Sequence, residues 1–252
     1  MSDVAPNAEL AETAVTDRSL GRPANPAHQS PRTGQRGLPA GRRALRLAEF
    51  VVLYAGGPLL IDWFYVPQVL IPLLLVSMSA CIVVLRRDPA FDRSQLTVGP
   101  SPSRANLWPM FLVFTAAVIV GIFVVSTEYP AQFFDLPRTK PLLWLAVMIL
   151  YPLLSVYPQE VMYRTFLMHR YRAVFPSRWM MIVASASAFS FCHILFNHWM
   201  PLALTFLGGL LFAFTYDRTR STLLASLEHA LYGCFIFTVG LGDFFYLSAA
   251  RA

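Results

Sequence analysis

Charged residues are scarce in this chain. Asp, Glu, Lys and Arg together make up only 13% of its 252 residues, about half the share found in soluble domains. Hydrophobic residues make up 56%, and they come in blocks of about 17 to 22, the length that crosses a hydrocarbon core of about 30 Å. Helices of soluble proteins keep a polar face instead. The composition therefore excludes a soluble globular domain and predicts an integral membrane protein.

Lysine is almost absent, since 19 of the 20 basic residues are arginine. The net charge of +6 could suggest a nucleic-acid partner, but such proteins carry a basic stripe across a folded surface. Here the arginines gather at the ends of apolar blocks, as they do in membrane proteins. We expect the lipid bilayer, and no nucleic acid, as a partner.

Cysteine is also rare. Cys81, Cys192 and Cys234 all lie inside apolar blocks, where cysteine behaves as a small hydrophobic side chain. The chain has no CxxC pair and no Cys/His spacing of a zinc finger. Neither a disulfide framework nor a structural zinc site is therefore expected.

The first 44 residues lack aromatic side chains and long apolar runs. The apolar core of a secretory signal peptide is missing before Leu45. The segment is rich in proline and small polar residues, which cannot bury enough apolar surface to offset the entropy of ordering. We predict a disordered cytoplasmic tail over residues 1–44 and a transmembrane domain over residues 45–252.

Seven apolar blocks have the length of a transmembrane helix, so the predicted fold class is an all-α polytopic transmembrane helix bundle. The predicted spans are 47–65, 69–85, 107–125, 141–157, 179–196, 202–216 and 223–241. A more polar helical stretch, 158–175, follows the fourth span. Pro152 and Pro158 permit a bend there, because proline interrupts the helical hydrogen bonds.

The distribution of basic residues predicts the orientation of these spans. With the N-terminus in the cytoplasm and seven alternating spans, the inner segments hold 17 basic residues and the outer segments hold three, Arg138, Lys140 and Arg251. This excess follows the positive-inside rule. We expect a protein of a bacterial inner (plasma) membrane with a cytoplasmic N-terminus.

Ionisable residues in membrane spans are costly and usually face an interior cavity. The chain has few of them: Glu160 with Arg164, then His193, then Glu228 with His229. Glu160 and Arg164 are four residues apart in the order that favours an ion pair on one helix face, although a solvated pair at the interface has the same spacing. His193 could likewise be a structural histidine.

The neighbours of these residues leave several roles open. Glu228 and His229 point about 100° apart on a helix, so Glu228 could instead balance an arginine, for example Arg164. Asn197 follows His193 by one helical turn. A carboxylate and two imidazoles can together activate a water molecule and stabilise a tetrahedral intermediate, which points to a hydrolytic site.

Three short patterns in this order resemble a known family. Gln159-Glu160-xxx-Arg164, Phe189-xxx-His193 and His229-xxx-Gly233 resemble the motifs EExxxR, FxxxH and HxxxN or HxxxD of the CAAX prenyl protease and bacteriocin-processing family of intramembrane proteases. The resemblance covers about residues 141–240. It implies a helical membrane bundle and a glutamate-dependent endopeptidase that acts on peptide or protein substrates.

The resemblance also implies roles for single residues. Glu160 and His193 would activate water, His229 would stabilise the oxyanion, and Arg164 would be the arginine of the first motif. No cofactor is required, although Glu160, His193 and His229 could ligate zinc.

Two positions depart from the family pattern. Gln159 stands in place of the first glutamate, and an amide cannot act as a general base at neutral pH. Gly233 stands in place of the asparagine and removes a possible oxyanion donor, which Asn197 or Gln159 could replace. Either Glu160 has taken over the base role or the activity has been lost.

Three functions follow as hypotheses. The first is an intramembrane endopeptidase that uses a water activated by Glu and His. The second is a catalytically inactive relative that acts as a membrane scaffold or an immunity-type protein, as the departures at Gln159 and Gly233 would favour. The third is a transporter or a metal-binding membrane protein. A proton path could use Glu160, Glu228 and the histidines, but the sequence shows no pair of the interrupted helices typical of transporters.

Overall fold

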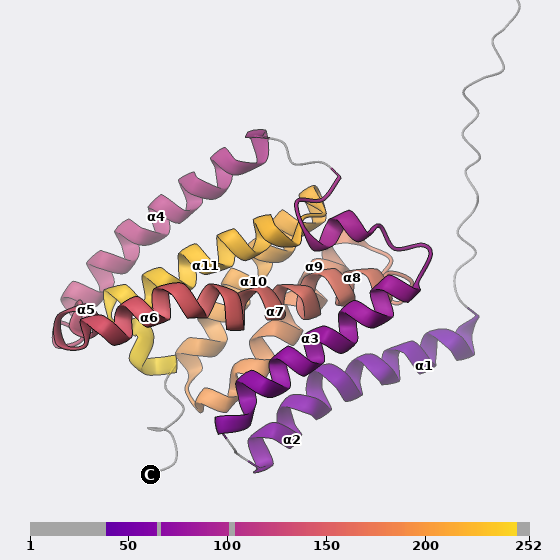
Figure 1. The fold of residues 1–252 in the computed structure, drawn as a ribbon, viewed down its shortest axis with the longest axis horizontal. Helices are drawn as coiled ribbons and strands as arrows, with labels where there is room; N and C mark the ends of the chain where they lie inside the picture. Colours follow the sequence, from indigo (N-terminus) through magenta and orange to yellow (C-terminus); the bar gives the residue numbers. More distant parts are fainter. Residues whose placement is uncertain (1–38, 65–66, 101–103, 246–252) are drawn as a thin grey trace, which may run out of the picture. The chain divides into compact units, whose positions relative to one another are not determined.

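The computed structural model describes residues 39–64, 67–100 and 104–245, all within one compact unit, Gly37–Ala252 (Figure 1). Within these residues seven helical segments are long and apolar enough to cross a membrane, which confirms the predicted all-α bundle. The segments are Ala40–Phe64, Pro67–Arg87, Leu107–Glu128, Pro141–Arg170, Arg178–Phe196, Trp199–Thr219 and Thr222–Val239. The orientation of the chain in the membrane stays a prediction.

The first span begins earlier than the sequence predicted. Helix α1 (Ala40–Val51) continues through a π-helical turn (Val52–Gly56) into α2 (Gly57–Phe64). Its first turn lies before Leu45, because a helix can extend beyond the apolar block that crosses the lipid. Residues 1–38 lie outside the described residues, so the disordered tail stays a prediction for them, whereas residues 40–44 are helical and not disordered.

The second and third spans are mostly regular. A 3₁₀ turn (Pro67–Val69) leads into α3 (Leu70–Arg87), and α4 (Arg104–Glu128) follows after a loop with a 3₁₀ turn at Arg93–Leu96. The short helix α5 (Asp135–Thr139) then connects α4 to the fourth span.

The fourth span is one continuous helical segment, Pro141–Arg170, which joins the predicted span 141–157 to most of the helical stretch predicted at 158–175. It runs through α6 (Pro141–Tyr151), a π turn (Pro152–Val156), α7 (Tyr157–Glu160), a second π turn (Val161–Phe166) and α8 (Leu167–Arg170). Proline removes one backbone donor, and the wider π turns accommodate this without ending the helix. Glu160 therefore lies well inside the span rather than near its end.

The fifth span changes from an α-helix to a tighter 3₁₀ helix at its C-terminal end. Helix α9 (Arg178–Phe191) passes into a 3₁₀ turn (Cys192–Phe196), and Asn197 takes a left-handed conformation with φ of 48°. The spacing that would place Asn197 one α-helical turn beyond His193 therefore does not hold. A short polar side chain such as asparagine tolerates this conformation well.

Helix α10 (Trp199–Thr219) packs against both α9 and α11 (Thr222–Val239), and α11 also contacts α4 and α6 (Figure 1). A Cβ atom at Gly209 would lie 3.1 Å from Cα of Ala186, so α9 and α10 approach closely at this point. Small residues allow such approaches between membrane helices. The close contact positions Phe189 of α9 over the interior polar residues.

The connecting segments meet at two ends of the bundle. At one end, the backbone carbonyl of Thr97 accepts hydrogen bonds from Leu223 N and from the hydroxyl of Ser221. At the other end, Phe134 N donates to the carbonyl of Val239 at the end of α11. The segments that share an end are those that alternating spans require.

Candidate active site

Glu160 and Arg164 form an ion pair inside the bundle. Arg164 Nε lies 3.4 Å from Glu160 Oε2, and both side chains are completely buried, with 0% exposure. The Arg164 guanidinium also donates to the hydroxyl of Ser185 on α9 over 3.2 Å, and that hydroxyl donates to the carbonyl of Tyr163. A solvated pair at the interface is therefore excluded.

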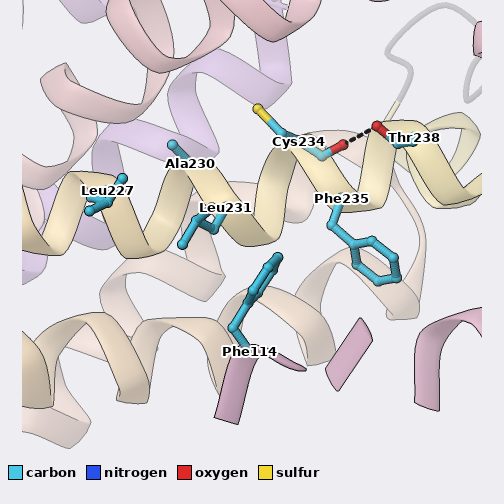
Figure 2. A pocket seen from close by; sticks show the side chains of 7 residues that line it. All are labelled: Phe114, Leu227, Ala230, Leu231, Cys234, Phe235 and Thr238. Carbon is cyan, nitrogen blue, oxygen red and sulfur yellow. Dashed lines mark hydrogen bonds between the residues drawn. The ribbon is translucent and has the colours of Figure 1, made fainter. Parts of the chain in front are cut away.

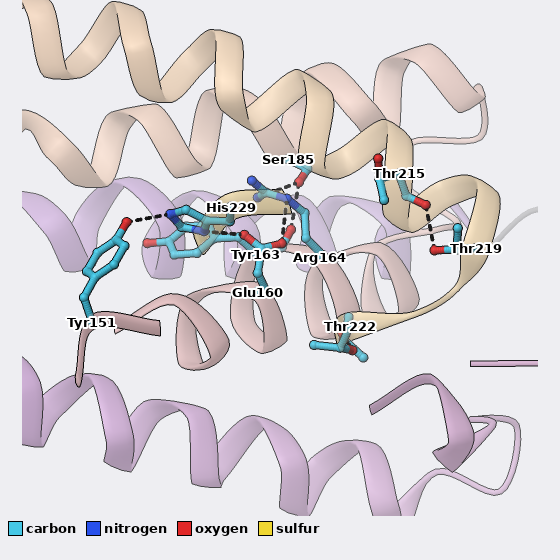
Figure 3. Close-up of polar contacts among 10 residues, drawn as sticks. Tyr151, Glu160, Tyr163, Arg164, Ser185, Thr215, Thr219, Thr222 and His229 are labelled. Carbon is cyan, nitrogen blue, oxygen red and sulfur yellow. Dashed lines mark hydrogen bonds and ion pairs between the residues drawn. The ribbon is translucent and has the colours of Figure 1, made fainter. Parts of the chain in front are cut away.

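The other carboxylate oxygen of Glu160, Oε1, is hydrogen-bonded to His229. His229 Nδ1 on α11 lies 2.9 Å from Glu160 Oε1 (Figure 3). The carboxylate paired with Arg164 can only accept a hydrogen bond, so Nδ1 carries the hydrogen and Nε2 keeps a lone pair. The contact fixes both the tautomer and the direction of the imidazole, as carboxylates do in hydrolase triads.

Tyr151 completes this chain of polar groups, and the sequence analysis missed it. Its hydroxyl lies 3.1 Å from Nε2 of His229 (Figure 3). Because Nε2 has the lone pair, the hydroxyl donates. The side chain fits there because residue 233 is glycine: a Cβ atom at Gly233 would lie 2.4 Å from the Tyr151 hydroxyl oxygen. A tyrosine in an apolar block carries no signal of such a role.

Two aromatic rings enclose His229. The ring of Phe212 stacks on the imidazole at 4.7 Å and 14°, and the ring of Phe189 meets it edge-on at 5.2 Å and 85°. The Arg164 guanidinium lies 4.6 Å from the centre of the same Phe189 ring, a favourable cation–π distance. The side chains of His229 and Glu160 are 6% and 0% exposed, so their contact is shielded from solvent.

His193 also contacts the ring of Phe189. Its ring centre is 4.8 Å from that of Phe189, and its Nδ1 lies 2.7 Å from the Phe189 carbonyl oxygen. A carbonyl only accepts, so Nδ1 carries the hydrogen and Nε2 keeps a lone pair. His193 and His229 therefore both contact the Phe189 ring, and each has an unprotonated Nε2. Only His229 is hydrogen-bonded to Glu160.

The remaining predicted residues lie around this centre or away from it. The Gln159 amide donates to the hydroxyl of Ser155 over 2.7 Å, and its oxygen is buried without a protein partner among the described residues. Asn197 is at the end of the 3₁₀ turn that carries His193. How either residue takes part in the site stays a prediction.

Glu228 faces a different part of the molecule from His229. It is 2% exposed and lines a hollow of about 130 Å³ together with Met110, Thr215 and Arg218. Its Oε2 is buried without a hydrogen-bond partner in the described part of the chain. The partner of Arg164 is Glu160, so the alternative that Glu228 pairs with Arg164 does not describe the observed ion pair.

The contacts of Glu160 and His229 differ from those of a metal-ligand group. Among residues 39–64, 67–100 and 104–245, no group of three or more His, Cys, Asp or Glu side chains is placed to hold one. The Arg164 cation sits beside Glu160, and the His229 nitrogens face Glu160 and Tyr151. Like charge from Arg164 would oppose a cation at this carboxylate.

The larger hollow lies beside the site rather than in it. Its volume is about 340 Å³, and Figure 2 shows its apolar lining along α11 and α4. The lining residues are Phe114, Leu227, Ala230, Leu231, Cys234, Phe235 and Thr238. Glu160, His193 and His229 do not line either of these two hollows.

Comparison with known proteins gives one family. Residues 139–235 match the family model described as Type II CAAX prenyl endopeptidase Rce1-like. The matched region contains Glu160, Arg164, His193 and His229. This part of the chain is therefore similar to the Rce1-like CAAX prenyl endopeptidases, the family whose motifs the three patterns resemble. No match was found among curated proteins or among solved structures.

Proposed function

We propose that the Rce1-like domain is an active intramembrane endopeptidase, which hydrolyses a peptide bond in a protein or peptide substrate near the membrane. The observation that carries this proposal is the buried chain from Arg164 through Glu160 to His229. It holds an imidazole in one tautomer and directs its lone pair toward the Tyr151 hydroxyl. Catalytic bases in hydrolases are held in this way.

We assign the proton transfer from water to His229, in place of the oxyanion role that the resemblance implied. Glu160 Oε1 contacts Nδ1 of His229, and Glu160 Oε2 lies 3.4 Å from Nε of Arg164. Water oxygen attacks the peptide carbonyl carbon while Nε2 of His229 accepts the proton. Glu160 stabilises the imidazolium that forms, since a carboxylate on Nδ1 favours the charged ring. Arg164 balances the carboxylate charge in the resting protein.

His193 is the second imidazole of the proposed site. We assign its Nε2 the role of accepting a hydrogen bond from the same water and orienting it. The contact of both imidazoles with the Phe189 ring supports this role. General base catalysis of this kind contributes about 10² to 10⁴ in rate. The proposed site needs no cofactor.

The proposal extends to location and partners. The domain lies in the lipid bilayer, and the arginine distribution favours an N-terminus in the cytoplasm. We infer a bacterial inner (plasma) membrane. The substrate would be a membrane-bound or membrane-associated protein or peptide. A prenylated C-terminus is not required by anything in the site.

A second candidate is an inactive relative that acts as a membrane scaffold or immunity-type protein. Gln159 and Gly233 favour it, since both depart from the motifs at positions that could bear chemistry. The tight packing around Glu160 is also compatible with a structural role. This candidate predicts that histidine substitutions leave the biological function intact.

The experiment compares N-terminal and C-terminal peptide profiles of membrane and secreted proteins from four strains. One strain lacks the gene, and three are restored with wild type, His193→Ala or His229→Ala at matched expression. A defined set of termini that returns with wild type and with neither variant supports the endopeptidase. Identical profiles in all restored strains would reject it and favour the scaffold.

A further inference from the structure

The two imidazoles of the proposed site offer hydrogen-bond acceptors, whereas an oxyanion needs a hydrogen-bond donor. Both imidazoles keep a lone pair on Nε2, because their Nδ1 hydrogens are committed to Glu160 and to the Phe189 carbonyl. Hydrolysis of a peptide bond places negative charge on the carbonyl oxygen, and fixed donors stabilise that charge. A pair of neutral histidines in these tautomers cannot supply such a donor.

Two other donor side chains near the site are directed at other groups. The guanidinium of Arg164 is completely buried behind Phe189 and faces Glu160 and Ser185. The amide of Gln159 donates to Ser155. The Tyr151 hydroxyl differs from both, because it points at Nε2 of His229, on the side of the imidazole that accepts the water proton.

The position of this hydroxyl is fixed by its surroundings. Tyr151 is the last residue of α6, directly before a π turn, and π turns often occur at functional sites. Its ring meets Phe237 at 5.3 Å and 71° and lies against the bare backbone of Gly233. Glycine at 233 is what leaves room for the ring, since any Cβ atom there would collide with it.

We propose that Tyr151 is a catalytic hydrogen-bond donor whose hydroxyl turns from His229 to the carbonyl oxygen of the scissile peptide bond. The inference rests on the proposed endopeptidase function and adds the oxyanion donor that the two histidines lack. A 3.1 Å separation between Oη and Nε2 places a carbonyl oxygen bound to Tyr151 next to the water that His229 activates.

The reaction balances with these groups alone. Water oxygen bonds to the carbonyl carbon, one water proton moves to Nε2 of His229, and the carbonyl π electrons move to the oxygen, which accepts the Tyr151 hydrogen bond. The C=O bond then re-forms, the C–N bond breaks, and the imidazolium proton passes to the leaving nitrogen. Tyr151 keeps its proton throughout.

Three variants of purified protein test this in mild detergent. The substrate is the solubilised membrane fraction of a strain that lacks the gene, and the readout is the initial rate at which new peptide termini form. Tyr151→Phe removes only the hydroxyl and should lower the rate about 10²- to 10³-fold, as loss of an oxyanion donor does.

Gly233→Ala should act in the same direction, because its Cβ displaces the ring. The double variant Tyr151→Ala with Gly233→Asn should regain at least tenfold over Tyr151→Phe, since the asparagine amide grows into the vacated space.

Tyr157→Phe is the matched control. It removes a hydroxyl from the same span, one that donates to the Leu96 carbonyl, and should leave the rate unchanged. Wild type and His229→Ala run in parallel. If both give the same termini, the proposed function fails and the inference falls with it. If His229→Ala is inactive but Tyr151→Phe cleaves like wild type, or the double variant regains nothing, the Tyr151 role alone is overturned.

Discussion

Glu160 and Arg164 lie in a setting where a single substitution has a large effect. Each is buried completely, and the pair lies 3.4 Å apart between Ser185 and the ring of Phe189. Removing one partner of a buried pair leaves the other charge without compensation, whereas replacing both can be nearly neutral. The pair therefore needs both members for a stable bundle.

Arg164→Ala should lower the free energy of unfolding by about 3 to 5 kcal/mol. The double variant Arg164→Met with Glu160→Gln should regain most of this loss, because no buried charge remains. Arg178→Ala is the control, since its pair with Asp217 is partly exposed and should cost less than about 1 kcal/mol. Denaturant titration in detergent measures all three. Equal losses for Arg164→Ala and Arg178→Ala would contradict the buried pair.

Glu160→Gln should lower the rate of terminus formation by about 10² to 10⁴, since the amide cannot stabilise the imidazolium of His229. Glu49→Gln is the control: Glu49 pairs with Arg170 outside the site, and its loss should leave the rate unchanged. The solubilised-membrane assay measures both. A Glu160→Gln protein as active as wild type would show that the carboxylate is not needed for chemistry.

Sequence reasoning could find the charged residues of the site but not all of its partners. Glu160, His193 and His229 stand out because ionisable groups are rare in apolar spans. Tyr151 does not, since tyrosine is common near membrane interfaces, and its contact with His229 depends on a glycine 82 positions away in the sequence. The spacing argument for Asn197 failed because a 3₁₀ turn replaced the α-helix.

The fourth span and the α9–α10 contact determine where the site residues lie. Two π turns flank α7. Glu160 is the last residue of α7 and Arg164 lies in the second π turn, so both residues lie in an irregular part of the helix. The apolar block was visible in the sequence, and its prolines permitted a bend, but the helical segment continues through both of them. Hydropathy gives the existence of a span, whereas local backbone geometry depends on the packing of its neighbours.

Gly209→Leu should lower the free energy of unfolding by about 1 to 3 kcal/mol, the usual cost of overpacking. A Cβ atom at this position would lie 3.1 Å from Cα of Ala186 and 3.3 Å from Phe189, so α9 must move. Gly57→Leu is the control, because nothing lies within 4 Å of its Cβ position. Detergent unfolding of the two proteins compares them. Equal stability would mean that α9 and α10 do not need their close approach.

On the scale of the whole molecule, the bundle separates its connecting segments into two ends. The sequence predicted this alternation from seven apolar blocks, and the arginine distribution assigns one end to the cytoplasm. The site residues lie between the ends, on spans four, five and seven. The hydrolytic centre is therefore expected within the membrane.

Single-cysteine labelling tests the orientation. In a protein with Cys81, Cys192 and Cys234 replaced, Ser177→Cys should react with a membrane-impermeant maleimide only after cells are opened. Thr139→Cys should react in intact cells, because its segment is predicted to face outward. The reverse pattern would contradict the assigned orientation, although it would leave the site geometry unchanged.

The most direct test of the central claim is the incorporation of ¹⁸O into new C-terminal carboxylates. Solubilised membranes from a strain that lacks the gene are incubated in H₂¹⁸O with purified wild type or His229→Ala. Hydrolysis by activated water forms one new C–O bond, so each C-terminus made by wild type should carry one ¹⁸O atom, and His229→Ala should make none above background. Wild type that forms no more labelled termini than His229→Ala would contradict the account.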